Sequence, residues 1–312
     1  MSQVSQVSQV SQVRMNDGPV PSRSDVDVVI VSYESASRLG PCLDSILGQP
    51  GLASVLVVDN GSTDHSEEVV AARPGVRWLS TGTNLGFGRA ANRAVAATSQ
   101  QYVCILNPDL EVRPNAIREL AAYLDAHPKV AIAAPMVVNP DGSSYPSARS
   151  FPSALDGIGH AVVGLVSSSN PWTRRYQRTA DPASPDWVSG TAMLLRREAV
   201  EAVGCFDERY FMYVEDVDLC WRLREAGWQI AQVPGAEVVH EQGVSSRRHP
   251  YRSVVDHHES AWRFLRRSTT GRSRIGLPVY GLGLGARLVL AVGKLAWTSR
   301  RASSPKRVPT ES

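Results

Sequence analysis

The 312-residue sequence has only four cysteines, and their spacing shows no pairing. Cys42, Cys104, Cys205 and Cys220 stand far apart, and no CxxC motif occurs. This argues against a disulfide framework. Cys104 lies in an apolar run and Cys220 in a helical pattern. We therefore expect small, buried thiols in a reducing compartment.

The N-terminus lacks an apolar signal segment. Residues 2–13 instead repeat Ser-Gln-Val four times, and this stretch is too poor in large apolar side chains to fold. We therefore expect a disordered leader over residues 1–24 and one folded domain over residues 25–267. A basic extension over residues 268–312 would follow that domain.

A long uncharged apolar run is also missing. Ile275–Trp297 is apolar and rich in glycine, but Arg287 and Lys294 interrupt it. The uncharged part, Ile275–Ala286, is shorter than the roughly 20 residues that a membrane-spanning helix needs. We expect a membrane-associating helix that lies in the headgroup plane. The alternative is a helix that packs on the domain or on another subunit of a homo-oligomer.

Positive charge is scarce in most of the chain and concentrated at its end, although the formal net charge is only +3. Residues 247–312 contain 14 Lys/Arg and three Asp/Glu, whereas the first 246 residues contain 19 and 27. A basic end on an acidic body indicates an anionic partner, such as membrane phospholipid, a diphosphate or nucleic acid. Few aromatic residues lie between these charges, which argues against nucleic acid. The simpler interpretation is a solvated tail.

Strands and helices alternate from Asp25 to Ala126. The expected strands are Val26–Ser32, Ser54–Val58, Val76–Ser80 and Tyr102–Leu106, and the expected helices are Ser37–Leu47, Thr63–Ala72, Arg89–Ala97 and Pro114–Ala126. This order predicts an α/β fold with a mostly parallel, Rossmann-like sheet covered by helices on both faces. From Ala131 the pattern is irregular. It becomes regular again in a strand at Thr191–Leu195, a helix at Glu215–Ala226, closing strands at Ile230–Val233 and Glu237–Val239, and a helix at Tyr251–Arg267.

Polar side chains follow the expected parallel strands. Ser32-Tyr33-Glu34, Asp59-Asn60, Asn84 and Asp109 all stand at or just beyond strand ends. Ligands of such sheets bind at the carboxyl ends of the strands, so the pattern predicts a binding site there. Asp109 in particular could bind a hard divalent cation, with a nucleotide diphosphate completing the shell. Asn-Pro-Asp turns also occur for purely structural reasons.

Two later clusters have both a structural and a chemical interpretation. Glu215, Asp216 and Asp218 open a helix, where acidic side chains favour the macrodipole. Residues 215 and 218 share a helix face, and residue 216 points elsewhere. A carboxylate beside a metal and a helix N-terminus would stay ionised, which is the state that a general base for an acceptor hydroxyl needs. His240 ends a strand, where a lone histidine is usually structural. Nearby Arg247 and Arg248 could clamp a diphosphate.

A glycine-rich first turn is absent. Gly86-x-Gly88-x-x-Ala91 matches the loose dinucleotide fingerprint, with Asp109 about 20 residues later. That fingerprint belongs to the first strand–helix turn, which here is Ser32–Ser35 and contains no glycine. A nicotinamide enzyme is therefore disfavoured.

Taken together, these clusters resemble glycosyltransferase family 2, inverting enzymes with the GT-A fold, over Asp25 to Arg267. The matching segments are Val29–Tyr33, Val58–Ser62, Asn84–Asn92, Asn107–Asp109, Trp187–Ala192, Glu215-Asp216 and His240. The resemblance implies a nucleotide pocket formed by Ser32, Tyr33, Glu34, Asp59, Asn60, Asn84, Gly86, Phe87, Asn92 and Asn107. It also implies Mg²⁺ or Mn²⁺ on Asp109 and His240, Asp216 as the base beside Glu215, and an acceptor loop of Trp187, Ser189, Gly190 and Thr191. Asn107 stands where the wider fold has a second metal-binding carboxylate.

Within the family, the Asn107–Asp109 turn, the Asn84–Gly88 loop and the Phe211–Arg222 segment are similar to rhamnosyltransferases of actinobacterial cell-wall assembly. That similarity implies transfer of L-rhamnose from dTDP-L-rhamnose to N-acetylglucosaminyl-diphospho-decaprenol at the cytoplasmic face of the plasma membrane. The alternatives are transfer of another sugar for polysaccharide or glycolipid synthesis, or a non-catalytic sugar-nucleotide-binding scaffold. Asn107 favours the scaffold, whereas Asp59, Asp216 and His240 argue against it.

Overall fold

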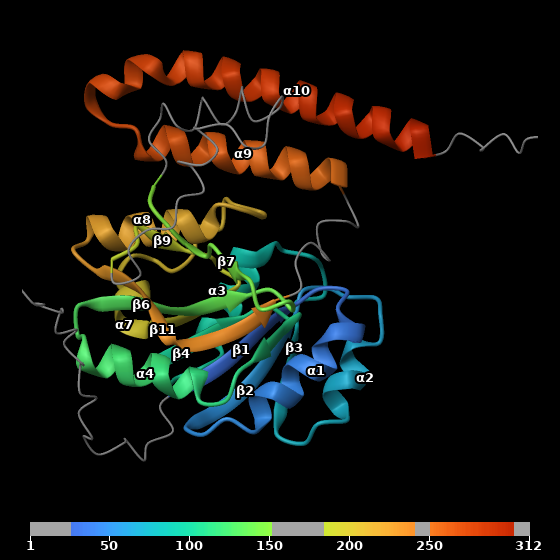
Figure 1. Ribbon diagram of the computed structural model, residues 1–312, viewed down its shortest axis with the longest axis vertical. Helices are drawn as coiled ribbons and strands as arrows, with labels where there is room; N and C mark the ends of the chain where they lie inside the picture. Colours follow the sequence, from blue (N-terminus) through green and yellow to red (C-terminus); the bar gives the residue numbers. More distant parts are fainter. Residues whose placement is uncertain (1–25, 152–183, 241–249, 303–312) are drawn as a thin grey trace, which may run out of the picture.

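The computed structural model describes residues 26–151, 184–240 and 250–302. These form a three-layer domain, with a pair of long helices lying along one side (Figure 1). The leader over residues 1–24, Arg247 and Arg248 lie outside the described residues.

One large sheet forms the middle layer. Its strands run in the order β3 (Val76–Ser80), β2 (Leu52–Asp59), β1 (Val26–Ser32), β4 (Tyr102–Leu106), β10 (Ala192–Arg196), β6 (Val130–Val138), β11 (Gln229–His240) and β5 (Leu110–Val112), and β7 (Ser144–Tyr145) pairs with β6. The expected parallel arrangement is present from β3 to β4. Beyond β4 the sheet is mixed, because β10 is antiparallel to both β4 and β6.

Helices cover both faces of this sheet, and alternate residues of β1 point to the two faces. Val28 and Ile30 pack in a cluster with α1 (Ala36–Leu47), α2 (Ser66–Ala71) and α4 (Ala116–Ala126). Val29 and Val31 pack in a second cluster with α3 (Phe87–Ala96), α7 (Arg197–Ala202) and α8 (Glu215–Glu225). Both faces are therefore buried, which explains why this strand is a nearly continuous apolar run, interrupted by Asp27.

The irregular pattern expected from Ala131 onward is wrong for β6, which lies inside the sheet between β10 and β11. Its sequence contains Pro135, and a proline argues against a central strand because it has no N–H to donate. The register resolves the conflict. β10 pairs with β6 only at Ile132 and Ala133, so Pro135 lies past the end of that pairing.

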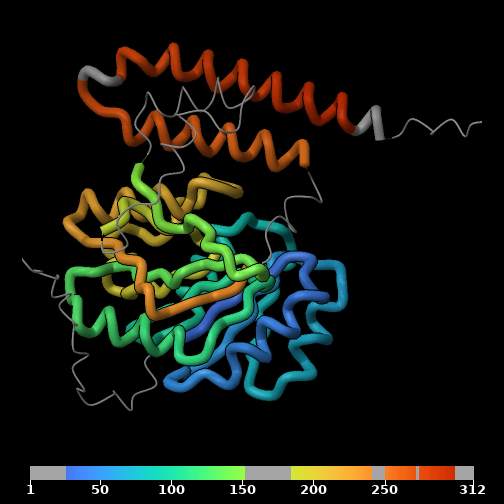
Figure 2. The backbone as a smooth tube through the Cα atoms, viewed as in Figure 1, coloured from blue at the N-terminus to red at the C-terminus, as the bar shows by residue number. Residues whose placement is uncertain are grey.

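Two long helices complete the described chain and run side by side in Figures 1 and 2. They are α9 (Pro250–Ser268) and α10 (Leu277–Ala302), joined by the short 3-10 helix η2 (Gly271–Gly276). α9 lies between α10 and the domain. Helix α10 continues through Arg287 and Lys294, so it is longer than the uncharged run alone suggested. Within the described residues, Arg274–Thr298 is one helical stretch that is long and apolar enough to cross a membrane, and none of its most apolar window is buried.

Candidate active site

The site is built on the edge of the sheet where β1, β2 and β4 end. Because these strands are parallel and in register, Ser32 pairs with Asp59 and both lie at this edge. Ser32 is fully buried, and its hydroxyl oxygen has no hydrogen-bond partner. The Glu34 carboxylate accepts hydrogen bonds from the backbone N–H and the hydroxyl of Thr63. These hydrogen bonds connect the segment after β1 to the segment after β2.

Asn60 connects the second strand end to the loop after β3. Its side-chain N–H₂ donates to Asn84 Oδ1 at 3.1 Å and to the carbonyl oxygen of Gly86 at 3.3 Å, and its Oδ1 accepts from the N–H of Leu85 at 2.9 Å. Asp59 accepts from the N–H of Ser62. The structure therefore brings together four of the expected nucleotide-pocket residues, Asp59, Asn60, Asn84 and Gly86.

Gly86 occupies a position that no other residue fits. Its φ is +87°, and a Cβ placed there would lie 2.1 Å from the carbonyl oxygen of Phe211. The same carbonyl accepts a hydrogen bond from the N–H of Phe87 at 3.1 Å. The glycines of the Asn84–Gly88 loop thus allow close packing against the segment that leads into α8. In a dinucleotide fingerprint, by contrast, glycines let the backbone approach a pyrophosphate.

Asn92 is the expected pocket residue that lies apart from the others. Its amide donates to the carbonyl oxygen of Phe206 and accepts from the N–H of Phe206. Both functional groups of the side chain therefore hold the loop after α7. Contact between Asn92 and a nucleotide stays a prediction.

Asp109 and His240 come together although 131 positions separate them in the sequence. The pairing of β11 with β5 sets His240 opposite Leu110, and His240 Nε2 lies 3.3 Å from Asp109 Oδ1. Both side chains are mostly buried, and the atoms Asp109 Oδ1 and His240 Nδ1 have no hydrogen-bond partner.

Asp109 Oδ1 and His240 Nε2 face each other at a distance that fits two ligands of one divalent cation. Oxygen and imidazole nitrogen are ligands of such ions in proteins. Within residues 26–151, 184–240 and 250–302, no group of three His, Cys, Asp or Glu side chains could form a shell. Two protein ligands leave several coordination positions for the oxygens of a nucleotide diphosphate and for water.

A short chain of contacts links this turn to Asp216. The N–H of Asn107 donates to the carbonyl oxygen of Thr191 at 2.9 Å, and the hydroxyls of Ser189 and Thr191 are 2.8 Å apart. The N–H of Gly190 then donates to Asp216 Oδ2 at 2.8 Å. The expected acceptor loop therefore lies between the cation ligands and the expected base.

Glu215 and Asp216 are adjacent carboxyls in different surroundings. Burial raises the pKa of Glu215 to about 8, and the negative charge of Asp216 adds to the rise. Its Oε2 has no hydrogen-bond partner. Burial also raises the pKa of Asp216, but hydrogen bonds from the N–H groups of Gly190 and Val217 and the positive charge of Arg149 oppose that rise. We infer that Glu215 carries the proton and Asp216 the charge.

Glu215→Gln tests this assignment through stability. A folded-state pKa of about 8, above the ordinary 4.5, means that the folded chain binds the proton more tightly than the unfolded chain. This contribution to stability is fully present below about pH 4.5 and is lost as the pH rises through 8. Glu215→Gln has no such proton. As the pH rises from about 4.5 to 8, the free energy of unfolding of the variant should therefore increase relative to that of wild type, by up to about 1.4 kcal/mol per pH unit.

Urea unfolding between pH 5 and pH 9 measures the difference between Glu215→Gln and wild type. Glu225→Gln, on an exposed residue of the same helix, is the matched control and should follow wild type at every pH. A Glu215→Gln curve parallel to wild type would show that Glu215 is ionised in the folded protein.

Arg149 is a site residue that the sequence did not reveal. It lies on β8 (Ala148–Arg149), which pairs with β9 (Trp187–Val188) so that Arg149 is opposite Trp187. Its guanidinium stacks over the rings of Trp187 and Tyr145, 5.4 Å and 5.8 Å from their centroids, and its Nε donates to the carbonyl oxygen of Pro146. No carboxylate within the described residues forms an ion pair with it. Its sequence surroundings, rich in Ser and Pro, gave no signal.

Comparison with known proteins agrees with this geometry. The family model for glycosyl transferase family 2 matches residues 27–204. The chain belongs to glycosyltransferase family 2. It is 42% identical over 258 residues to the N-acetylglucosaminyl-diphospho-decaprenol L-rhamnosyltransferase of Mycobacterium tuberculosis, covering 76% of this chain and 83% of the relative. It is 27% identical to the rhamnosyltransferase WbbL of Escherichia coli, covering 78% of this chain and 93% of the relative.

Solved structures share the fold at low sequence identity. The mannosyltransferase PcManGT from Pyrobaculum calidifontis, in complex with GDP-Man and Mn²⁺, superposes with a TM-score of 0.55 at 16% identity, over 92% of this chain and 79% of that one. Glucosyl-3-phosphoglycerate synthase from Mycobacterium tuberculosis, with Mn²⁺ and UDP, gives 0.51 at 17% identity, over 78% and 79%. The chain therefore has the GT-A fold, and its family and its mycobacterial relative make it a nucleotide-sugar-dependent glycosyltransferase.

Proposed function

We propose that this glycosyltransferase moves L-rhamnose from dTDP-L-rhamnose to N-acetylglucosaminyl-diphospho-decaprenol, with inversion at the anomeric carbon. The observation that carries the proposal is the 42% identity to the mycobacterial enzyme of that name, over 76% of this chain and 83% of that enzyme. The contact chain from Asn107 through Gly190 to Asp216 supports it, because one reaction needs the cation and the base on the same edge of the sheet.

In the proposed reaction the donor binds across the ends of β1, β2 and β4. Asp59, Asn60 and Asn84 line the nucleotide side, and Asp109 and His240 hold Mg²⁺ or Mn²⁺. When bound there, the cation would supply positive charge that stabilises the diphosphate as a leaving group. Asp216 accepts the proton of the acceptor hydroxyl while that oxygen attacks the anomeric carbon from the face opposite the leaving group. Glu215 stays neutral and limits the negative charge beside the base.

The proposed acceptor site lies on the side of Asp216 formed by Gly190 and Trp187. Gly190 has no side chain to fill the space beside Asp216, where a Cβ would already be 3.4 Å from the aspartate Cβ. The Arg149 guanidinium, which forms no ion pair with a carboxylate of the described residues, lies next to this space, and arginine is well suited to a diphosphate. We assign Arg149 to the acceptor diphosphate, the role that the sequence had suggested for Arg247 and Arg248.

The proposed location is the cytoplasmic face of the plasma membrane, where a lipid-linked acceptor is available. α10 supplies the apolar surface, and the basic charge of residues 247–312 favours anionic lipid. Because α10 lies along α9, we favour a helix resting on the membrane over one that crosses it.

A donor screen tests the proposed specificity. The melting temperature of the full chain is measured with dTDP-L-rhamnose, UDP-sugars and GDP-sugars, each with and without Mn²⁺. We expect dTDP-L-rhamnose to raise it by several degrees only when metal is present, because the cation joins the diphosphate to Asp109 and His240. A metal-dependent shift with another donor would identify a different sugar. No shift with any donor would favour the scaffold interpretation.

A further inference from the structure

A cluster of arginines lies where α9 packs beside α8 and the loop that precedes it. A cavity of about 490 Å³ is lined by Arg209, Glu259, Trp262, Arg263, Arg266 and Arg267. Five of these residues come from one face of α9, and Arg209 comes from the loop that precedes α8. Four guanidinium groups and a single carboxylate therefore surround one open space.

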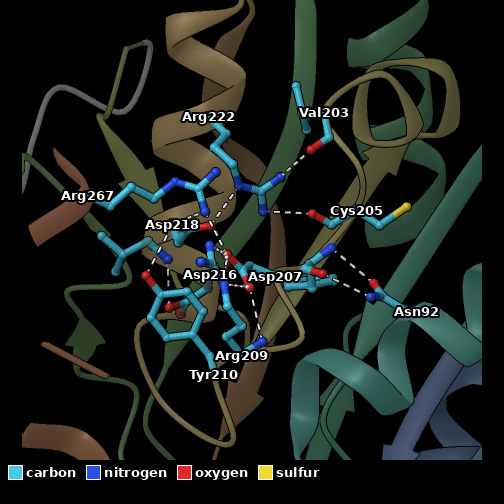
Figure 3. Close-up of polar contacts among 12 residues, drawn as sticks. Asn92, Val203, Cys205, Asp207, Arg209, Tyr210, Asp216, Asp218, Arg222 and Arg267 are labelled. Carbon is cyan, nitrogen blue, oxygen red and sulfur yellow. Dashed lines mark hydrogen bonds and ion pairs between the residues drawn. The ribbon is translucent and has the colours of Figure 1, made fainter. Parts of the chain in front are cut away.

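An inner layer of ion pairs neutralises part of this charge (Figure 3). Arg267 lies 2.6 Å from Asp207 and 3.5 Å from Asp218, and Arg222 lies 2.7 Å from Asp218. Arg209 also donates to Asp207, and its hydrogen bonds hold the pKa of that carboxyl well below its usual range. Asp207 and Asp218 are therefore already paired with arginines of this inner layer.

The outer layer of the cavity consists of Arg263 and Arg266, whose positive charges are not neutralised in this way among the described residues. Arg263 stacks over the ring of Tyr210 at 5.9 Å, and both Arg263 and Arg266 are exposed. Neither forms an ion pair with any carboxylate among the described residues. Like charges held this close repel one another, so an anion that entered the cavity would be attracted by several charges at once. Guanidinium groups in such a cluster suit phosphate oxygens particularly well.

The cavity adjoins the surface that α10 turns outward. Trp262 packs against α10 at Gly281, where a Cβ would lie 3.1 Å from the indole ring. The opposite side of α10 exposes an apolar stripe at helical spacing, consisting of Val279, Leu282, Val289 and Leu290. Their exposed fractions are between 56% and 77%, so within the described chain most of this stripe faces outward.

The arginine cavity on α9 and the apolar stripe on α10 are separated by about one helix diameter. Packed helices have axes about 8–10 Å apart. A helix whose apolar face enters the boundary between headgroups and acyl chains reaches about 5–10 Å into it. With α10 in that position, α9 and its arginines would be level with the lipid phosphates. Trp262 suits the same zone, because tryptophan is enriched at membrane interfaces.

We propose that the arginine cavity binds the phosphate of an anionic phospholipid headgroup while the apolar stripe of α10 contacts the acyl chains. The inference rests on the proposed membrane location and adds a second anion site, distinct from the donor and acceptor sites. It gives the protein a defined orientation, with α9 as the element that connects lipid to the catalytic domain.

The test uses short-chain lipids that stay monomeric, so it needs neither a membrane nor sugar transfer. Dihexanoylphosphatidylglycerol is titrated into the full chain, and fluorescence from Trp262 is isolated by comparison with Trp262→Phe. We expect saturable binding that the double variant Arg263→Gln/Arg266→Gln weakens roughly 10- to 30-fold, because two phosphate-directed charges are removed. Arg118→Gln/Lys129→Gln, which removes two charges around α4 on the far side of the domain, should bind like wild type.

Three results would overturn the proposal. Equal binding of dihexanoylphosphatidylcholine would show that the acyl chains act alone, and equal weakening by the Arg118/Lys129 variant would show a diffuse charge effect. Saturation by inorganic phosphate at the same concentration would make free phosphate the ligand. Because no arm depends on transfer, a failed donor screen with a positive lipid titration would separate this inference from the proposed function.

Discussion

Asp216→Asn should reduce sugar transfer by roughly 10²- to 10⁴-fold, the usual contribution of a positioned general base. The substitution keeps the size of the side chain but removes the site that accepts the acceptor's proton. The proposed donor site lies on the other side of the Gly190 loop, so we expect the metal-dependent melting shift with donor to be preserved. Transfer is measured by release of dTDP under saturating donor and acceptor.

The variant also has a predictable structural cost. Asp216 accepts from the N–H of Gly190 through Oδ2 and from the N–H of Val217 through Oδ1, and an asparagine can accept only one of the two. One backbone N–H then loses its partner, which costs about 1–3 kcal/mol of stability. The activity is therefore compared at a temperature where both proteins are folded. Wild-type turnover in the folded variant would remove Asp216 from the role of base.

The first half of the fold follows from elementary patterns. β1 and β4 are almost entirely apolar because both of their faces are covered. The polar residues that follow them stand at one edge because the strands are parallel. That reasoning correctly brought Ser32, Asp59, Asn60 and Asp109 to one side of the sheet. It needed only the order of the elements and the direction of the strands.

The second half depends on pairings that local patterns do not encode. β10 enters the sheet antiparallel, and β6 carries a proline where its pairing with β10 has already ended. Arg149 acquires its importance only because β8 pairs with β9, about 40 residues later in the sequence. The irregular composition around Arg149 hides this contact, since two-residue strands have no periodicity of their own.

The protonation of the carboxyl pair was equally hidden. The sequence shows Glu215 and Asp216 as neighbours at a helix start, and helix periodicity correctly separates their faces. Which of them keeps a proton depends on burial and on hydrogen bonds from Gly190 and Val217. Burial and these hydrogen bonds are tertiary properties. The Glu215-Asp216 motif alone therefore predicts the reaction but not which of the two carboxyls is ionised.

The strongest test of the metal site is Asp109→Asn. Asparagine has the same shape, but its neutral amide oxygen is a much weaker cation ligand than a carboxylate. We expect at least a roughly 100-fold loss of Mn²⁺-dependent transfer, since even indirect partners of metal ligands commonly change affinity by about 10- to 100-fold. The metal-dependent melting shift with donor should disappear as well. Titration calorimetry of Mn²⁺ in the presence of dTDP measures the affinity directly.

Glu111→Gln is the matched control for that experiment. Glu111 lies two residues beyond Asp109, but it is exposed and forms an ion pair with Arg113 at 2.7 Å. Removing its charge changes the local electrostatic field without removing a ligand, so Mn²⁺ affinity should stay within about twofold of wild type. Equal losses in the two variants would mean that the cation responds to the general negative field of this turn. A loss confined to Asp109→Asn assigns the coordination bond to one carboxylate, which Asn107 cannot replace.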